Sequence, residues 1–365
     1  MPLPLTVLAG PSTALRDDLL RCLVLRRPGL AALVYEVVPG GVVRRVLDAE
    51  GQQHSEQLEL EGCCLSCTVR ADVELGLALV AGAGRWSAIV LGLPASTQPG
   101  DLLPVLHDVD GVQVDTVTTV VDARLLLSQL TGDDLLADRG IAAAPTDRRS
   151  TAELVLGQLE RADLLAVVDL HRTGTAQART ASALLAHLAP LAQQVVIGPG
   201  GAGCDEVVGA GRHVAETSEA DRERLAALAV ELCPPACGVT TLRWECDQPL
   251  HSGRLAQVLG QLLAGVVRSR GHLWLADRSA TRLRWESAGG SLSVGDARPW
   301  RDEPRGSSLV LTGVQLDAAA VRELLDGCRC TPDELSGQAS WDDPFVAALG
   351  PVAEPSGRAA PRTDG

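Results

Sequence analysis

Three cysteines lie within five positions of this 365-residue chain: Cys63, Cys64 and Cys67. Cys64 and Cys67 have C-x-x-C spacing, which lets two thiolates bind one zinc ion at about 2.3 Å each. Cys63 offers a third thiolate if the backbone turns back at that point. A complete zinc site needs four ligands, and the sequence has no second C-x-x-C pair. Glu36, at the expected end of a strand, is a candidate ligand from elsewhere in the chain.

Three interpretations of this cysteine triplet remain open from its spacing alone: a labile metal site, a redox-active thiol pair, or buried structural cysteines. A redox pair is typical of a thioredoxin-like context, which this sequence lacks. If a metal binds, Zn²⁺ is the expected one, because thiolate-rich sites favour it. The remaining cysteines are weaker signals. Cys22, Cys204 and Cys246 are interpreted as core or isolated residues, and no role is assigned to Cys233, Cys237, Cys328 or Cys330.

A second feature is a short apolar run that ends at Gly10 and is followed by a helical stretch, the arrangement of a phosphate-binding loop. Compared with G-x-x-x-x-G-K-[ST], only Gly10 matches. Leu15 stands at the second glycine, Arg16 at the lysine and Asp17 at the hydroxyl residue. A Cβ disfavours close approach of the backbone to phosphate, and the carboxylate of Asp17 would repel it. A strand-to-helix turn without a ligand is the simpler interpretation of this stretch taken alone.

The composition excludes some chemistry. All 32 basic residues are arginine, and the chain has no lysine and no asparagine, so mechanisms that need an ammonium or an Asn amide are ruled out. The net charge of −14 does not favour binding to nucleic acid, and we expect no direct sequence-specific contact with it. No signal peptide and no run of 18 apolar residues is found, which predicts a cytoplasmic protein that does not contact membranes.

Over roughly the first 230 residues, strand-like and helix-like segments alternate. The expected strands are 5–9, 31–34, 88–91, 117–121, 164–168 and 194–197, and the expected helices are 14–25, 73–83, 151–161 and 176–188. Such alternation predicts an α/β domain, residues 1–232, with a mostly parallel sheet and flanking helices.

The pattern changes after Val239 to strand, helix, strand, strand, strand, helix. The expected strands are 240–245, 271–276, 282–286 and 309–312, and the expected helices are 256–263 and 318–325. This order predicts a small α+β domain, residues 233–349, with helices on one face of an antiparallel sheet. The Pro-, Gly- and Ala-rich residues 350–365 are predicted to be a disordered tail.

Taken together, these segments resemble the CobW family of P-loop GTPases, which are implicated in delivering zinc or cobalt. Tyr35-Glu36 is similar to the Asn-Glu of that family, and Cys64-Leu-Ser-Cys-Thr68 to its Gly-Cys-x-Cys-Cys-Thr metal motif. Val120-Val-Asp-Ala123 is intact. The segments 249–255, 268–274 and 341–345 match further motifs in the right order. The Cys-x-Ser-Cys-Thr-x-Arg form resembles an actinobacterial branch of the family.

The resemblance implies a P-loop-type sheet domain followed by a CobW C-terminal domain. It assigns metal ligation to Cys63, Cys64, Cys67 and Glu36, and a degenerate nucleotide site to Gly10, Arg16, Asp17 and Asp122. The guanine-reading Asn-Lys-x-Asp is replaced by Val168-Asp-Leu-His171. Several charge-assisted contacts to nucleotide are therefore missing, and each such contact is of the strong kind. We expect GTP with Mg²⁺ to bind weakly or not at all, and GTP hydrolysis to be lost.

The function predicted from the sequence is that of a metallochaperone-like, zinc-binding accessory protein in zinc homeostasis, whose partner is the metal ion. The alternative is a protein-binding adaptor whose partner is a client protein or the ribosome. Members of the actinobacterial branch resemble factors linked to zinc-starvation ribosomes and their hibernation. Under the adaptor hypothesis, the thiols sense zinc or fold their own loop.

Overall fold

The computed structural model of the chain describes residues 2–38, 41–60, 65–214, 225, 234–300, 304–336 and 343–350. It consists of two compact units, each with its own sheet. The first comprises Met1–Thr241 with Ala288–Ser291, and the second Leu242–Ser287 with Leu292–Gly365. Residues 351–365 of the predicted tail, and residues 226–233 beside the predicted domain boundary, lie outside the described residues.

The described strands of the first unit form one sheet in the order β4-β3-β2-β5-β1-β6-β7-β8. Their bounds are Leu3–Ala9 (β1), Leu30–Val38 (β2), Gly41–Asp48 (β3), Gly51–Leu58 (β4), Ala88–Gly92 (β5), Val112–Asp122 (β6), Leu164–Val168 (β7) and Gln193–Ile197 (β8). From β2 to β8 every neighbouring pair is parallel. The strand β3 pairs antiparallel with both β2 and β4. The sheet is thus a parallel core extended by an antiparallel edge.

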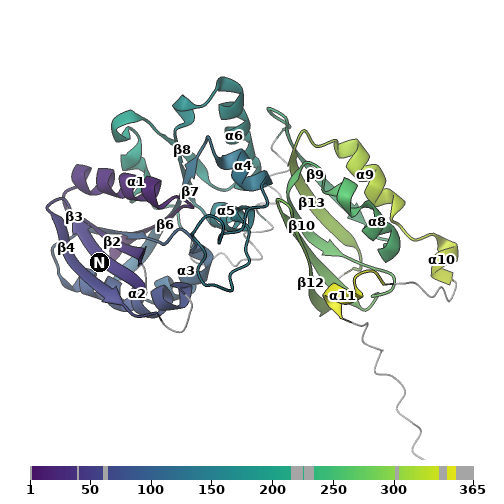
Figure 1. Cartoon of the computed structure of the whole chain (residues 1–365), viewed down its shortest axis with the longest axis horizontal. Helices are drawn as coiled ribbons and strands as arrows, with labels where there is room; N and C mark the ends of the chain where they lie inside the picture. Colours follow the sequence, from purple (N-terminus) through teal and green to yellow (C-terminus); the bar gives the residue numbers. More distant parts are fainter. Residues whose placement is uncertain are drawn as a thin grey trace, which may run out of the picture. The chain divides into compact units, whose positions relative to one another are not determined.

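Helices cover both faces of this sheet because alternate side chains of its buried strands point to opposite sides (Figure 1). Leu5 and Val7 of β1 share a core with α2 and α3, whereas Leu8 packs with α1. The helices are α1 (Thr13–Arg26), α2 (Leu65–Gly82), α3 (Pro99–His107), α4 (Leu126–Thr131), α5 (Thr151–Glu160) and α6 (Thr175–Leu188), with short 3₁₀ turns η1 (Leu170–Arg172), η2 (Pro199–Gly201) and η3 (Cys204–Val207). The crossover helices α1 and α2 begin at the edge where the parallel strands end.

The second unit has an antiparallel sheet with helices packed against it. Its described strands follow the order β12-β11-β10-β13-β9. Their bounds are Val239–Cys246 (β9), Val266–Leu273 (β10), Thr281–Ala288 (β11), Ser291–Pro299 (β12) and Ser307–Val314 (β13). The helices are α8 (Ser252–Leu262), α9 (Ala318–Gly327), α10 (Pro332–Ser336) and α11 (Val346–Leu349). Trp244 and Trp285 are buried with apolar residues of α8 and α9 in one core.

The predicted fold class is confirmed: a mostly parallel α/β sheet is followed by a small α+β unit. The sequence did not reveal β3, β4, α3, α4 or β12. The residues of β4 are polar and exposed along almost its whole length, so it carries no apolar alternation to detect. The predicted strand 271–276 was wrong in its bounds, since β10 runs from Val266 to Leu273. Two half-buried arginines of β10, Arg268 and Arg270, interrupt the apolar run that marks a strand.

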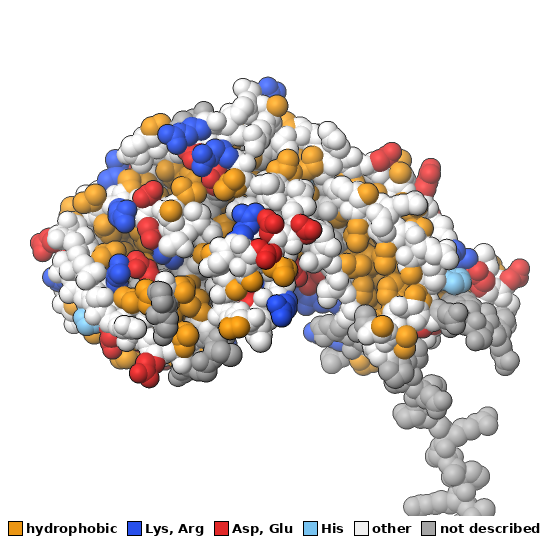
Figure 2. Space-filling view, in the orientation of Figure 1, with side chains coloured by type: hydrophobic (Ala, Val, Ile, Leu, Met, Phe, Trp, Pro, Cys, Tyr) orange, Lys and Arg blue, Asp and Glu red, His pale blue; other side chains and the backbone are white. Residues whose placement is uncertain are grey.

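Charges of both signs are mixed over the first unit. On the face shown in Figure 2, arginine and acidic side chains lie next to one another there and do not gather into a patch of one sign. None of the described helices is long and apolar enough to cross a membrane.

Candidate functional site

The cysteine triplet is described only in part, because Cys63 and Cys64 lie outside the described residues. Cys67 is the third residue of α2 and is exposed. Glu36 is half-buried near the end of β2, and its carboxylate forms an ion pair with Arg45 at 3.0 Å. Since β4 runs in the same direction as β2 and leads into α2, Cys67 and Glu36 come from the same edge of the sheet. Parallel α/β sheets place their ligands at this edge.

A buried polar network fixes α2 on the sheet next to this thiol segment. Asp72, five residues after Cys67, accepts hydrogen bonds from Tyr35 Oη at 2.7 Å and from Arg44 Nη1 at 2.7 and 2.8 Å. The Arg44 side chain is 2% exposed, and Glu56 pairs with its other terminal nitrogen. Burial, reinforced by Asp72, raises the pKa of Tyr35, so its hydroxyl stays protonated and donates. Breaking such a buried pair is costly, so the network anchors the helix that carries Cys67.

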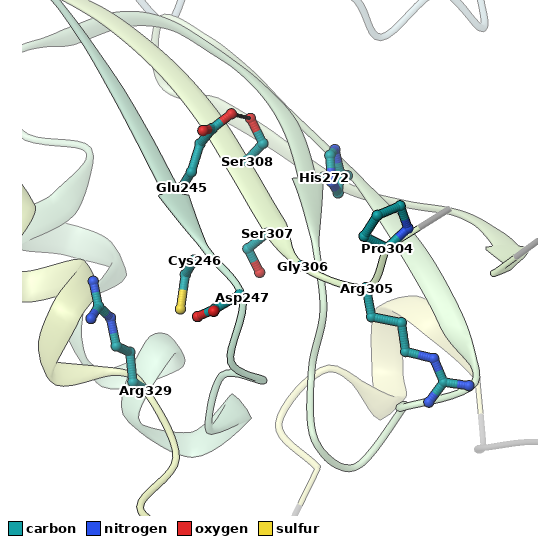
Figure 3. Close-up of a pocket in the computed structure, with 10 residues that line it drawn as sticks. All are labelled: Glu245, Cys246, Asp247, His272, Pro304, Arg305, Gly306, Ser307, Ser308 and Arg329. Carbon is teal, nitrogen blue, oxygen red and sulfur yellow. Dashed lines mark hydrogen bonds between the residues drawn. The ribbon is translucent and has the colours of Figure 1, made fainter. Parts of the chain in front are cut away.

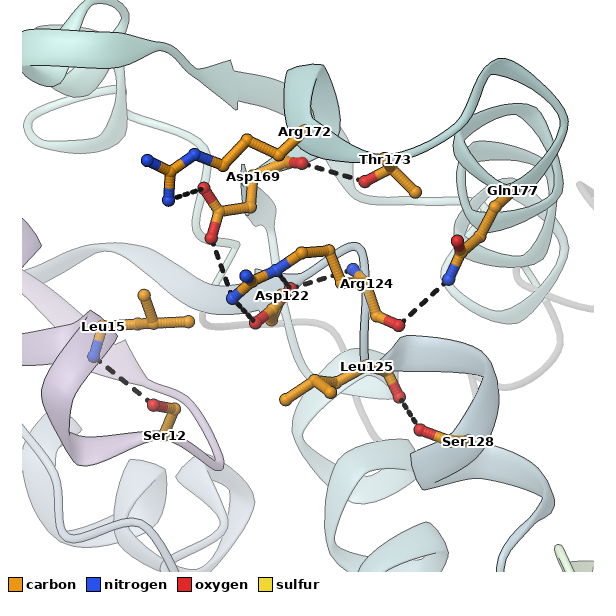
Figure 4. Close-up of polar contacts among 10 residues, drawn as sticks. All are labelled: Ser12, Leu15, Asp122, Arg124, Leu125, Ser128, Asp169, Arg172, Thr173 and Gln177. Atoms are coloured by element: carbon orange, nitrogen blue, oxygen red, sulfur yellow. Dashed lines mark hydrogen bonds and ion pairs between the residues drawn. The ribbon is translucent and has the colours of Figure 1, made fainter.

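The turn from β1 into α1 is short and closed by its own contacts. Only Gly10, Pro11 and Ser12 separate the strand from Thr13, where α1 begins. The Ser12 hydroxyl accepts a hydrogen bond from the backbone N–H of Leu15 at 3.4 Å (Figure 4). The backbone carbonyl of Ser12 accepts one from the N–H of Arg16 at 3.1 Å. This is ordinary helix capping. Two backbone N–H groups of this turn, those of Leu15 and Arg16, are therefore bonded within it.

Arg16, at the position of the P-loop lysine, points into the protein and is completely buried. Its guanidinium donates to the backbone carbonyl of Leu93, which follows β5, and to the carboxylate of Asp17 at 2.7 and 2.9 Å. Gly10 packs against β6: a Cβ at this position would lie 3.0 Å from the carbonyl oxygen of Val120. Gly10, Arg16 and Asp17 thus make contacts within the fold.

An ion-pair cluster occupies the ends of β6 and β7 (Figure 4). Asp122, the last residue of β6, is 5% exposed and pairs with Arg124 at 2.9 Å. The same guanidinium reaches Asp169 at 2.9 Å, and Arg172 approaches Asp169 from the other side at 3.6 Å. Asp169 adopts a left-handed backbone conformation with φ of 56°. The hydrogen bond that Arg124 donates to Asp122 is the main cause that raises the pKa of Arg124, so the guanidinium remains charged beside both carboxylates.

The second unit contains a surface pocket of about 520 Å³ at the end of β9 (Figure 3). Two of its charged side chains form ion pairs with neighbours: Glu245 with Arg243 at 2.7 Å, and Arg329 with Asp326. We assign no ligand to it. Nearby Cys328 and Cys330 are buried, and desolvation raises the pKa of each thiol to about 11. These two cysteines are therefore protonated, and the described residues give them no metal partners.

Two side-chain pairs escaped the sequence analysis because their members are far apart in the chain. Cys204 lies in an apolar core and Cys22 packs against it, as expected of core residues, and their Sγ atoms are 3.2 Å apart. Desolvation raises the pKa of Cys204 to about 12, so this thiol is protonated. The Nε2 atoms of His107 and His213 lie 3.0 Å apart. No local motif marks either pair, and only the fold brings them together.

Fold and sites together define a P-loop-type α/β unit followed by an α+β unit. Residues 239–329 match the family model described as the cobalamin synthesis protein cobW C-terminal domain. The chain is 30% identical over 322 residues to the zinc chaperone Rv0106 of Mycobacterium tuberculosis, covering 82% of this chain and 74% of that protein. The chain therefore belongs to the CobW family.

More distant similarities exist. The chain is 22% identical over 321 residues to zinc-regulated GTPase metalloprotein activator 1 of Dictyostelium discoideum, covering 80% of this chain and 67% of that protein. The crystal structure of the Zn(II)-bound YjiA GTPase from E. coli is 20% identical and is covered completely, with 90% of this chain aligned and a TM-score of 0.38.

Proposed function

We propose that this CobW-family chain is a zinc-binding accessory protein that works without GTP. The proposal rests on a contrast between two positions at one edge of the sheet, the nucleotide position and Cys67. The nucleotide position is filled by contacts of the protein with itself, whereas Cys67 is exposed at the start of a firmly anchored helix. The relative named a zinc chaperone supports the choice of metal.

The residues at the nucleotide position do not fit GTP with Mg²⁺. The N–H groups of Leu15 and Arg16 are bonded to Ser12, and the Arg16 guanidinium is held by Leu93 and Asp17. A nucleotide would have to break these contacts and then meet the carboxylate of Asp17. We assign no step to GTP, and propose that its hydrolysis is absent.

The thiol segment supplies the chemistry for zinc as cargo. Thiolates and a carboxylate suit Zn²⁺. Cys67 lies in the first turn of α2, where the helix dipole favours a negative charge. Under the proposal, Cys64 and Cys67 are ligands, Cys63 is a further candidate, and Glu36 joins them when it leaves Arg45. A ligand that must exchange one partner for another suits a site that releases its ion.

The test is a Zn²⁺ competition titration against a chromophoric chelator, using reduced protein. Wild type is compared with Cys64→Ser/Cys67→Ser and with the control Cys237→Ser, which removes an exposed thiol outside the triplet. We expect nanomolar or tighter binding in wild type and the control, and its loss in the double variant. Equal, weak binding in all three would contradict the zinc proposal and make the adaptor hypothesis the leading one.

Two further measurements separate the hypotheses. Calorimetry with Mg-GTP should show no micromolar binding, and detection of such binding would contradict the closed nucleotide position. Co-sedimentation of the chain with ribosomes from zinc-starved cells is the result that the adaptor hypothesis requires. Absence from the ribosome fraction would count against the adaptor.

A further inference from the structure

Two imidazole rings meet on the surface of the first unit. His107 is the last residue of α3 and is exposed, while His213 follows η3 and has a side chain that is 5% exposed. The two residues are 106 positions apart in sequence, and their Nε2 atoms are separated by 3.0 Å. Their ring centres lie 5.2 Å apart, with an angle of 33° between the ring planes.

Asp163 orients the inner ring of this pair. Its carboxylate oxygen lies 2.9 Å from Nδ1 of His213 and also accepts the backbone N–H of Val117 at 2.9 Å. The Asp163 side chain is 6% exposed, so its position is fixed. A carboxylate acceptor keeps the proton on Nδ1 and leaves the Nε2 lone pair directed at His107. Metal-binding histidines in proteins are almost always oriented by a second-shell partner of this kind.

The backbone around His213 is fixed as well. The N–H groups of Arg212 and His213 donate to the carbonyl of Asp115 at 2.9 and 2.8 Å, and the N–H of Gly211 donates to its carboxylate at 3.1 Å. His213 is therefore held by hydrogen bonds at both its backbone and its ring. The outer imidazole, on His107, is exposed and free to adjust its ring.

The ring spacing fits a shared metal ion. With Zn–N bonds of about 2.0–2.1 Å, two imidazoles on one tetrahedral ion have nitrogens about 3.3 Å apart and ring centres about 5.2 Å apart. The observed ring centres already have this separation. Because His213 is held, His107 would have to turn and shift until both lone pairs meet at one side of the line between the nitrogens, which opens them from 3.0 Å and makes room for the ion. Without an ion, a proton between the two Nε2 atoms, in an N–H···N hydrogen bond, occupies the same space.

Electrostatics at this position favour a cation. The carbonyl end of α3, where His107 sits, carries the negative end of the helix dipole. Asp108 follows directly, and Asp163 lies behind the inner ring. No group of three or more metal-ligating side chains is found among the described residues, so two nitrogens are the protein's share and the remaining positions would hold water. Binding would thus be weak and exchangeable.

We propose that His107 and His213, with Asp163 as the orienting carboxylate, form a second divalent-cation site that is independent of the cysteine triplet. The site takes ions that prefer imidazole, Zn²⁺ or Cu²⁺, with Cu²⁺ bound more tightly by the usual order of stabilities. It goes beyond the proposed function, because it does not require the thiols. In a zinc-handling protein, such a site would give the ion a second, lower-affinity position.

The test uses the full chain with Cys63→Ser/Cys64→Ser/Cys67→Ser, so that the thiols cannot contribute. Zn²⁺ is titrated in competition with a weak chromophoric chelator, and one equivalent of Cu²⁺ is examined by electron paramagnetic resonance. We expect one site with two nitrogen ligands. Adding His107→Gln should abolish detectable Zn²⁺ binding and remove one nitrogen from the Cu²⁺ spectrum. The control His54→Gln removes an exposed histidine 3.5 Å from a carboxylate and should change neither readout.

Asp163→Asn tests the inner half of the site without replacing His213, whose substitution could prevent folding. Its amide oxygen can still accept from Val117 and His213, but the charge is lost, and we expect zinc affinity to fall by about tenfold. Absence of Zn²⁺ binding in the thiol-free chain, or binding equal in the His107→Gln and His54→Gln versions, would overturn the proposal. These outcomes are distinct from failure of the thiol site, which shows in the comparison of wild type with Cys64→Ser/Cys67→Ser.

Discussion

At the edge of the first sheet where the parallel strands end, two halves differ in where their polar groups are bonded. Around β1, β6 and β7, cations and N–H groups are bonded to the protein's own acceptors: Arg16 to Leu93 and Asp17, and Arg124 to Asp122 and Asp169. Around β2 and α2, the buried network lies beneath the surface and Cys67 remains exposed. Internal ion pairs can thus either close a site or support one, and the difference lies in where they sit relative to the ligand position.

The largest effect is expected where the network supports the thiol half. Asp72→Ala leaves the buried guanidinium of Arg44 without the carboxylate that accepts from its Nη1, so the free energy of unfolding should fall by about 3 kcal/mol. Chemical denaturation followed by circular dichroism measures this. Asp18→Ala is the matched control, because the exposed pair of Asp18 with Arg21 should contribute no more than about 0.5 kcal/mol. Equal effects of the two substitutions would mean that α2 is not anchored through Asp72.

Arg16→Lys tests the closed half and should have the next largest effect. A lysine cannot reproduce the fork that reaches both Leu93 and Asp17, and the site is buried, so we expect destabilisation by about 2 kcal/mol. If Arg16 is instead a phosphate contact, the same change brings the chain closer to a P-loop and strengthens Mg-GTP binding in calorimetry. Arg21→Lys, at an exposed position of the same helix, should change neither quantity.

Ser12 gives a smaller and complementary test of the same turn. Ser12→Ala removes the cap on Leu15, and the free energy of unfolding should fall by about 1 kcal/mol. Ser12→Asp keeps a cap and should retain the wild-type stability. Neither variant should acquire Mg-GTP binding. A stable Ser12→Ala variant would show that the hydroxyl does not cap the helix and that the turn is open to other partners.

Whether the sequence could predict a contact in these two halves depends on how far apart its two residues lie along the chain. The strands that begin and end the crossovers are local features that the sequence predicted, and so is the replacement of the P-loop glycine and lysine by Leu15 and Arg16. The contact that buries Arg16 joins α1 to Leu93, 77 positions away, and has no local signature. The sequence places Arg16 at the position of the P-loop lysine, whereas the structure directs its charge inward. The thiol triplet stays a sequence prediction, because two of its three cysteines lie outside the described residues.

The same limit applies to the histidine pair. His107 and His213 each stand alone in the sequence, and a lone histidine is more often a packing residue than a ligand. Their value as a pair depends on α3 ending beside the segment after η3, and on Asp163 lying behind them. Local patterns cannot encode either relation.

The smallest effect is expected from Arg45, and it tests whether Glu36 takes part in zinc binding. Arg45 is one-third exposed and holds the Glu36 carboxylate at 3.0 Å. A metal must displace this guanidinium to use Glu36, so Arg45→Gln should strengthen zinc binding, by about two- to fivefold for a pair of this exposure. Chelator competition measures the dissociation constant, with Arg21→Gln as the control for loss of a surface charge.

The double variant decides between a direct and a general electrostatic effect of Arg45. If the arginine acts by holding Glu36, Arg45→Gln should have no effect in a Glu36→Gln background, whereas Glu36→Gln alone should weaken binding. If Arg45 only repels the incoming cation, the gain should persist without Glu36. Persistence of the gain would remove Glu36 from the ligand set and leave the thiols of α2 and its preceding segment as the whole of the protein's contribution.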